Sequence, residues 1–312
     1  MMSLKKHKAL LGGAVAALSM ATFMASGASA LDPGYRAPDP NNTLVIETTK
    51  GQVVVEMYPQ LAPNHVVRMV TLARQHFYDG LIFHRVIENF MDQTGDPKGD
   101  GSGGSTLPNI KGEFTIRHDA SFPMTVASHP AGSLIGFVGA MPVQSQVNEL
   151  MAISNDGKTQ AWGLYCQGVL GMARDNDPDS ANSQFFLMRD PNPSLEKNYT
   201  AFGAVLTGLD VVRKIKIGSP AVNPDKMISV QVLADMPEAT RPNIEVMDTA
   251  SPQFQAVIDA TRKKMGADFS ACDVTVPAKD LNAPAAAATA TTASATIPVA
   301  PMPSTGGSGG SY

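Results

Sequence analysis

The chain has 312 residues, of which 17% are charged, and its formal net charge is −4. Proteins that bind nucleic acid usually carry a basic excess that neutralises phosphates, so this balance argues against a nucleic-acid partner. The length allows one large domain or two of ordinary size, with enough chain to bury a core.

Residues 1–30 have the three-part layout of a secretory signal peptide. A lysine pair near the start precedes an apolar run at about 9–24, and a small-residue site, Ala-Ser-Ala, follows at 28–30. An uncleaved anchor helix is the alternative, although the run is slightly short for a membrane span. The sequence therefore predicts export, most fittingly to a bacterial periplasm, and no membrane span in the mature chain.

The next segments predict a linker, a hairpin and a helix. Residues 31–42 are rich in Pro, Asp and Asn, which is typical of a linker. β-Branched runs at 43–48 and 53–58 lie on either side of Gly51 and predict a hairpin, a common start for a β-barrel. Residues 59–77 carry apolar residues at helical spacing and predict a helix over one mouth of the barrel.

The most informative stretch is Ile82–Asp96, which reads I-F-H-R-V-I-E-N-F-M-D-Q-T-G-D. It places Arg85 among apolar residues and predicts a strand that ends in a lined groove. Five glycines follow within 95–104. A phosphate-cradling loop would need a G-K-[ST] sequence, which is missing here, so a surface loop is the preferred interpretation.

A second stretch, Gly168–Leu187, reads G-V-L-G-M-A-R-D-N-D-P-D-S-A-N-S-Q-F-F-L. Together the two stretches resemble the signature segments of the cyclophilin-type peptidyl-prolyl isomerases, with their F-H-R, F-M-x-Q, M-A and S-Q-F-F pieces. The resemblance implies a mainly β fold over residues 43–236. That fold is a closed eight-stranded antiparallel β-barrel capped by two helices, here with an insertion and a C-terminal helical extension.

Compared with that family, the path from Glu113 to Gly168 is long. The excess lies at about 129–165 and contains Trp162, the only tryptophan. Disordered segments favour charge over such residues, so this insertion is expected to be ordered. It is interpreted mainly as packing against the barrel, and a substrate-selecting lip is the alternative.

The C-terminal third predicts a short helix at 208–217, a closing strand at 227–234 and an extension at 237–276. In that extension, Ser251-Pro252 begins a helix with apolar residues at helical spacing, and it is expected to dock on the barrel. Residues 277–312 form a tail, whose last thirty residues are Ala, Thr, Pro, Ser and Gly with few apolar side chains to bury. This tail is expected to be disordered.

The resemblance also implies the roles of individual residues. Arg85 would be the catalytic guanidinium, and Gln93 would hold it in place. The neighbouring His84 is interpreted as a packed side chain because the reaction transfers no proton. The remaining substrate-binding residues would line the proline slot or flank the peptide ahead of the proline: Phe90, Met91, Phe186 and Leu195 in the slot, Ala173, Arg174 and Gln184 along the peptide, and Tyr199 at a further pocket position.

Three residues depart from the family pattern. Arg174 stands where many members have Asn, at a position that works largely through its main chain. Ser194 stands where many eukaryotic members have a Trp linked to cyclosporin binding, and Tyr199 replaces a pocket His. Catalysis should survive these changes, whereas inhibitor affinity is left open. The segment between Met172 and Ser183 is one residue longer than the common form, so its alignment stays open too.

The chain has two cysteines, Cys166 and Cys272. Export makes oxidation available, so they are expected to form a disulfide that ties the extension to the barrel. The six histidines show no ligand spacing, so neither a metal nor another cofactor is expected. The expected partners are proline-containing segments of unfolded or exported proteins, bound by a monomer.

The sequence thus predicts a periplasmic isomerase that assists the folding of exported proteins. A non-catalytic proline-binding chaperone on the same barrel is the main rival, although such a module would be expected to lose Arg85. A hydrolase built on Ser183 or Ser128 with His84 or His129 is a third interpretation. It lacks the G-x-S-x-G elbow.

Overall fold

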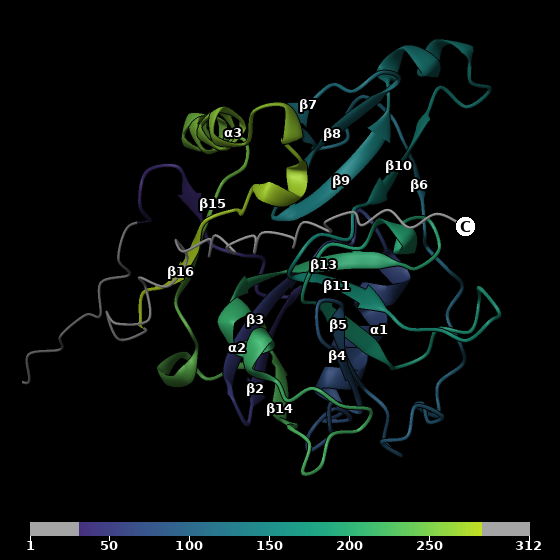
Figure 1. The fold of residues 1–312 in the computed structure, drawn as a ribbon, viewed down its shortest axis with the longest axis vertical. Helices are drawn as coiled ribbons and strands as arrows, with labels where there is room; N and C mark the ends of the chain where they lie inside the picture. The colour runs from purple at the N-terminus through teal and green to yellow at the C-terminus, as the bar shows by residue number, and fades with distance from the viewer. Residues whose placement is uncertain (1–30, 283–312) are drawn as a thin grey trace, which may run out of the picture. The chain divides into compact units, whose positions relative to one another are not determined.

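The computed structural model describes residues 31–282, so the expected signal peptide and the end of the expected tail lie outside the described residues. The described chain contains three antiparallel sheets and three α-helices (Figure 1). The helices are α1 (Pro63–Arg74), α2 (Leu209–Lys214) and α3 (Pro252–Met265). Short 3-10 helices lie between these elements: η1 (Asn148–Ile153), η2 (Pro193–Leu195), η3 (Leu233–Asp235), η4 (Glu238–Thr240), η5 (Gly266–Asp268) and η6 (Ala271–Asp273).

The largest sheet has eight strands, curls strongly and runs in the order β14-β2-β3-β13-β11-β12-β5-β4. Its strands are β2 (Thr43–Thr48), β3 (Gly51–Met57), β4 (Arg85–Ile87), β5 (Met91–Thr94), β11 (Val169–Met172), β12 (Phe185–Met188), β13 (Ala201–Thr207) and β14 (Met227–Val232). The hairpin of β2 and β3 and the helix α1 agree with the sequence predictions.

The expected closed barrel is not closed by strand pairing. The edge strands β4 and β14 do not pair with each other, and only the isolated bridges Ile82–Lys226 and Val86–Gly218 join the two edges. The segment that faces β4 contains Pro220 and Pro224. Because proline has no backbone N–H to donate, this segment cannot extend a ladder, and the sheet is best described as a strongly curled half-barrel.

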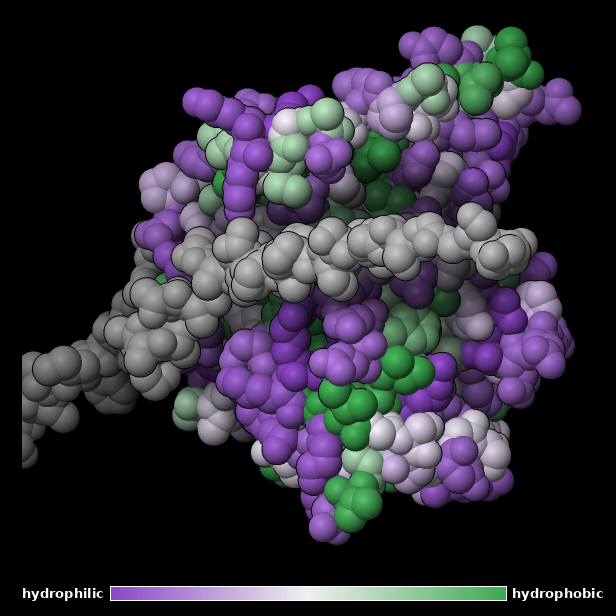
Figure 2. All heavy atoms as spheres, viewed as in Figure 1, coloured by the Kyte–Doolittle hydropathy of each residue, from purple (hydrophilic) through white to green (hydrophobic). Residues whose placement is uncertain are grey.

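The expected insertion forms a five-stranded sheet in the order β6-β10-β9-β8-β7. Its strands are β6 (Ile116–His118), β7 (Thr125–Ser128), β8 (Ser133–Val138), β9 (Met141–Gln146) and β10 (Thr159–Gly163). The segment is therefore ordered, as predicted, but the sheet begins before residue 129, at Ile116. In this segment Ile153 of η1 is 80% exposed. Figure 2 shows patches of apolar colour on the molecular surface.

A third sheet joins the two ends of the described chain. It has the order β1-β15-β16, with strands β1 (Tyr35–Arg36), β15 (Ile244–Met247) and β16 (Ala278–Asp280). Residues 31–42, expected as a linker, therefore take part in the fold through β1. The expected tail likewise begins with a paired strand, β16, because Val246 pairs with Ala278.

The strands of the large sheet bury apolar side chains on both faces. Leu44 and Ile46 of β2 belong to one core together with α1 and α2, whereas Val45 belongs to a second core with the five-stranded sheet and the C-terminal extension. Val53, Val54 and Val55 of β3 divide between the two cores in the same way. Double-sided burial explains why these strands read as unbroken apolar runs.

Helix α3 begins where the sequence predicted, with the Ser251 hydroxyl accepting a hydrogen bond from the amide of Phe254. It docks, however, on the five-stranded sheet rather than on the barrel. Phe254 packs edge-on against Phe137 of β8 with 5.2 Å between ring centroids, and Arg262 donates a hydrogen bond to the carbonyl of Ala127 in β7. An amphipathic pattern shows that one helix face is buried but not what covers it.

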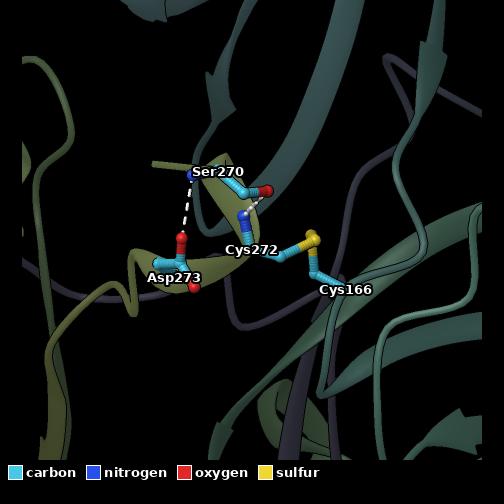
Figure 3. The surroundings of a disulfide bond; sticks show 4 residues. All are labelled: Cys166, Ser270, Cys272 and Asp273. Carbon is cyan, nitrogen blue, oxygen red and sulfur yellow. Dashed lines mark hydrogen bonds between the residues drawn. A yellow bond between two sulfur atoms is a disulfide. The ribbon is translucent and has the colours of Figure 1, made fainter. Parts of the chain in front are cut away.

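Cys166 and Cys272 form a disulfide across a sequence separation of 106 residues (Figure 3). Cys272 lies in η6, whose start is stabilised by a capping box. There the Ser270 side chain accepts from the amide of Cys272, and Asp273 accepts from the amide of Ser270 at 2.8 Å. The disulfide thus anchors a locally ordered turn of the extension to the segment between β10 and β11.

Candidate active site

Three side chains form a row across neighbouring strands of the large sheet. Arg85 of β4 pairs with Gln93 of β5, and Gln93 pairs with Phe186 of β12. Directly opposed residues in antiparallel strands point to the same face, so the row places a cation, an amide and an aromatic ring side by side. These are the residues at the centres of the two sequence motifs.

The next position in the row is Gly171 of β11, which pairs with Phe186. A Cβ atom at this glycine would lie 2.5 Å from the ring of Phe186 and 2.8 Å from the ring of Tyr165. Such contacts are far below van der Waals separation. The glycine in the G-M-A piece is therefore required so that two aromatic rings can lie against the strand.

A chain of hydrogen bonds fixes the guanidinium of Arg85. Its Nη1 donates to Oε1 of Gln93 at 3.2 Å, and Nε2 of Gln93 donates to Oε1 of Gln184 at 2.9 Å. Gln184 in turn donates to the carbonyls of Gly101 and Gly103. Each amide uses both its oxygen and its nitrogen, so the chain has one direction and Arg85 is its terminal donor.

The glycine-rich loop at 95–104 supports this chain, as the preferred surface-loop interpretation allows. The buried carboxylate of Asp96 accepts hydrogen bonds from the amides of Lys98, Asp100 and Gly101. Burial acts to raise the pKa of Asp96, but these amides hold it below its ordinary value. The loop thus presents its carbonyls to Gln184, a role that the sequence pattern did not reveal.

The apolar floor beside Arg85 consists mainly of aromatic rings, with Leu195 and Met91 beside them. Phe186 stacks on Tyr165 with 5.8 Å between centroids and meets Tyr199 edge-on at 6.2 Å. Leu195 of η2 is buried in the same core, and Met91 is buried beneath Arg85, whose Nη1 lies 3.9 Å from its sulfur. The ring of Phe90 lies 5.8 Å from the guanidinium carbon of Arg85. All these except Tyr165 were predicted.

The residues expected along the peptide lie at one end of this floor. The amide of Ala173 donates to the carbonyl of Gln184 at 2.9 Å. The guanidinium of Arg174 lies over the ring of Tyr199 at 4.5 Å and over the ring of Phe114 at 5.7 Å. The structure therefore brings all ten predicted catalytic and substrate-binding residues into one region.

Sequence reasoning missed two contributors to this region. Tyr165 was assigned to the end of the insertion, and Phe114 was not singled out. Neither has a local signal of its own, because each reaches the floor through long-range packing, on Phe186 and on Arg174 respectively.

A buried ion pair lies on the opposite face of β5. Asp92 is fully buried, and one of its carboxylate oxygens lies 3.3 Å from Nε of Arg189. Burial raises the pKa of Asp92 to about 7, although Arg189 acts to lower it. The Arg189 guanidinium also donates to the carbonyls of Val212 and Ile215 at the end of α2. The pair therefore connects the strand that carries Gln93 to that helix.

The structure offers no support for general-base chemistry at this site. Burial lowers the pKa of His84, which favours the neutral ring of a packed histidine. The hydroxyl of Ser183 is buried and donates to the carbonyl of Gly95, so it is committed to the loop. Within residues 31–282, no cluster of three or more His, Cys, Asp or Glu side chains could hold a metal ion.

Comparison with known proteins identifies the family. The family model described as "Cyclophilin type peptidyl-prolyl cis-trans isomerase/CLD" matches residues 43–233, more than half of the chain. The chain belongs to this family. The cyclophilin match covers the eight-stranded sheet together with the five-stranded insertion sheet.

Relatives extend the likeness beyond that range. A "Probable peptidyl-prolyl cis-trans isomerase" of Brucella suis is 35% identical over 235 residues, which cover 70% of this chain and 96% of the relative. The crystal structure of cyclophilin AquaCyp293 from Hirschia baltica is 36% identical with a TM-score of 0.73, and the match covers 78% of this chain and 92% of that one. The high coverage shows that most of this chain's architecture recurs in another cyclophilin.

Proposed function

We propose that this cyclophilin isomerises X-Pro bonds by binding the twisted amide beside Arg85. Rotation about an X-Pro bond crosses a barrier of about 18–20 kcal/mol, while the two isomers differ by only about 0.5–1 kcal/mol. In the twisted state the proline nitrogen regains a lone pair, because conjugation with the carbonyl is lost. A donor placed at that nitrogen stabilises the twisted amide more than either planar form, and such differential binding is what accelerates the reaction.

The observation that carries this proposal is the position of Arg85. Its guanidinium is half-buried, is oriented by Gln93 and lies beside the aromatic floor. Among the described residues, no carboxylate lies within 4 Å of it to neutralise its charge. The proline ring would lie on Phe186, Met91 and Leu195. The preceding residues would run past Gln184 and Ala173 toward Arg174.

The clients are proposed to be exported proteins in the bacterial periplasm, where the enzyme acts as a monomer. Two observations support this compartment: the signal-peptide layout of residues 1–30, and the disulfide between Cys166 and Cys272, which persists in oxidising compartments. No helix in the described part of the chain has the length and apolarity to cross a membrane.

A protease-coupled assay on a Pro-containing peptide tests the catalytic proposal. We expect the protein to accelerate cis-to-trans conversion at catalytic concentrations. Binding of the peptide without acceleration would favour the non-catalytic chaperone instead. An Arg85→Ala variant serves as the control, because it should still bind the peptide on the aromatic floor.

Cell fractionation tests the location. We expect the protein in the periplasmic fraction of an expressing bacterium, with its first residue at Leu31. A cytoplasmic protein that retains residues 1–30 would contradict the export proposal and leave the catalytic one untouched.

A further inference from the structure

Arg174 lies along the proposed path of the peptide, but the positive charge of its side chain has no assigned role. Arg174 stands where an uncharged residue would suffice if the position acted only through its main chain. Its guanidinium is half-buried and rigidly held: Nε donates to the carbonyl of Asn198 at 3.0 Å, and Nη1 donates to the carbonyl of Asp175 at 2.6 Å. The rings of Tyr199 and Phe114 contact it as well. The side chain is therefore already ordered in the free protein, so binding a ligand would cost it little further conformational entropy.

The charge of Arg174 is not neutralised inside the described chain. It forms no ion pair among residues 31–282, and Nη2 donates no hydrogen bond there. The acids of the adjoining loop, Asp175, Asp177 and Asp179, are exposed and none of them pairs with it. The Nη2 nitrogen of this guanidinium is left to donate to a carboxylate, and a charge-assisted hydrogen bond of that kind is a strong one.

The distance between Arg174 and the proline site limits which residues of a bound peptide Arg174 can contact. Arg174 lies on Tyr199, and Tyr199 contacts Phe186, the centre of the apolar floor. The guanidinium of Arg174 lies 4.5 Å from the ring of Tyr199, and the ring centroids of Tyr199 and Phe186 are 6.2 Å apart. Together these distances span no more than about three extended residues of a bound peptide. Lys197 is a weaker candidate for the same role, because it is exposed over the Trp162 ring and follows Glu196 directly in the sequence.

We infer that Arg174 is a specificity-determining residue that selects substrates with an acidic side chain within three residues before the proline. This inference rests on the proposed function, which sets where the peptide lies. It assigns the side chain of Arg174 a task that the isomerisation step itself does not require.

The test compares matched peptides on one enzyme. Acetyl-capped peptides of the form Ala-Ala-Xaa-Pro-Phe-p-nitroanilide carry Glu or its neutral isostere Gln at the first, second or third position before the proline, with Ala at the other two. The readout is the Glu-to-Gln ratio of kcat/KM in the protease-coupled assay. Because the ratio is taken on the same enzyme, a general change in the activity of a variant cancels.

We expect the parent enzyme to prefer Glu by about three- to fivefold at low salt at one of these positions, the size of a partly exposed ion pair. Arg174→Gln should bring the ratio close to one, as should about 1 M NaCl, which shortens the screening length to roughly 3 Å. Arg74→Gln is the matched control, since it removes an exposed arginine that pairs with Asp235. It should keep the preference.

A ratio near one in the parent enzyme at all three positions would overturn the inference, and so would a preference that survives in Arg174→Gln or is lost in Arg74→Gln. A peptide with Glu placed after the proline should show no preference. If it shows the stronger one, the assigned side of the site is wrong. Absence of turnover on every peptide would instead refute the proposed function, so the two failures are distinguishable.

Discussion

Arg85 and Gln93 lie directly opposite each other on β4 and β5, and the guanidinium donates to the amide oxygen at 3.2 Å. The pairing register aligns the two residues, and the hydrogen bond then fixes the rotamer of the arginine. The backbone ladder thus aligns the proposed catalytic donor with Gln93, and the hydrogen bonds from Gln93 through Gln184 to the glycine-rich loop support its orientation.

Replacing Arg85 with Ala should reduce kcat/KM by two to three orders of magnitude and leave the fold intact. Loss of one preorganised donor in a site of this kind costs about 2.7–4 kcal/mol of transition-state stabilisation. Arg85→Lys should rescue poorly, because a point charge cannot use the planar geometry that Gln93 orients. The protease-coupled assay measures the rate, and circular dichroism checks the fold. If turnover stays within about threefold of the parent, Arg85 is not the catalytic residue.

Replacing Gln93 with Ala should lower kcat/KM by roughly fivefold, corresponding to about 1 kcal/mol for one hydrogen bond. As a positioning residue, Gln93 should act only through Arg85. In an Arg85→Ala background the Gln93→Ala change should therefore have little further effect. The matched control is Gln52→Ala, which removes an amide that donates to Glu47 outside the site. Additive losses in the double variant would refute the positioning role.

Asp92 should make the stability of the protein fall as pH rises from about 4 to 7. Burial raises the pKa of its carboxyl from 3.8 to about 7 in the folded state. Between pH 3.8 and about 7 the folded protein binds more protons than the unfolded one. The stabilising contribution of protonated Asp92 is therefore fully present below pH 3.8 and is lost as pH rises to about 7. Asp92→Asn should flatten the profile of the unfolding free energy over this range.

Denaturant titrations at several pH values measure that profile. Asp235→Asn is a control of opposite sign, because the exposed Arg74 side chain lowers the pKa of Asp235. Any stability that Asp235 contributes is lost as pH falls. An Asp92→Asn profile as steep as that of the parent would show that Asp92 ionises normally in the folded protein.

Removing the disulfide should destabilise the protein without removing the site residues. In the chain-entropy model, a loop of about 100 residues contributes roughly 4.7 kcal/mol at 25 °C. Paired Cys166→Ser and Cys272→Ser changes should therefore lower the unfolding free energy by about 4–5 kcal/mol, and a reductant should have the same effect on the parent. A loss below about 1 kcal/mol, or two free thiols in the unreduced, denatured parent, would contradict this prediction.

The central row of the site was predictable because its residues occur in the two motifs that carry the resemblance to the cyclophilins. Arg85 and Gln93 occur in one continuous motif, Phe186 occurs in another, and side-chain alternation puts them on one face once the strands pair. Helix α3 was predictable from its cap. The motif residues and the helix start can be identified from neighbouring residues alone, without knowing which element packs against them.

The features that sequence reasoning missed depend on contacts between residues far apart in the sequence. β1 pairs with a strand about 200 residues later, so its composition resembled that of a linker. The carbonyls of the glycine-rich loop orient Gln184, but any residue type presents a carbonyl, and no sequence pattern identifies it. The incomplete closure of the barrel depends on the irregular backbone opposite β4, whose effect only the assembled sheet reveals.

The sheet that joins β1, β15 and β16 places a limit on how this enzyme itself folds. Tyr35 cannot pair with Met247 until nearly the whole described chain has been synthesised. Such distant contacts raise the contact order and slow the search for the native state. Until the late strand arrives, the early one offers unpaired backbone groups to other chains. An isomerase of this architecture is therefore late to mature and exposed to aggregation while it folds.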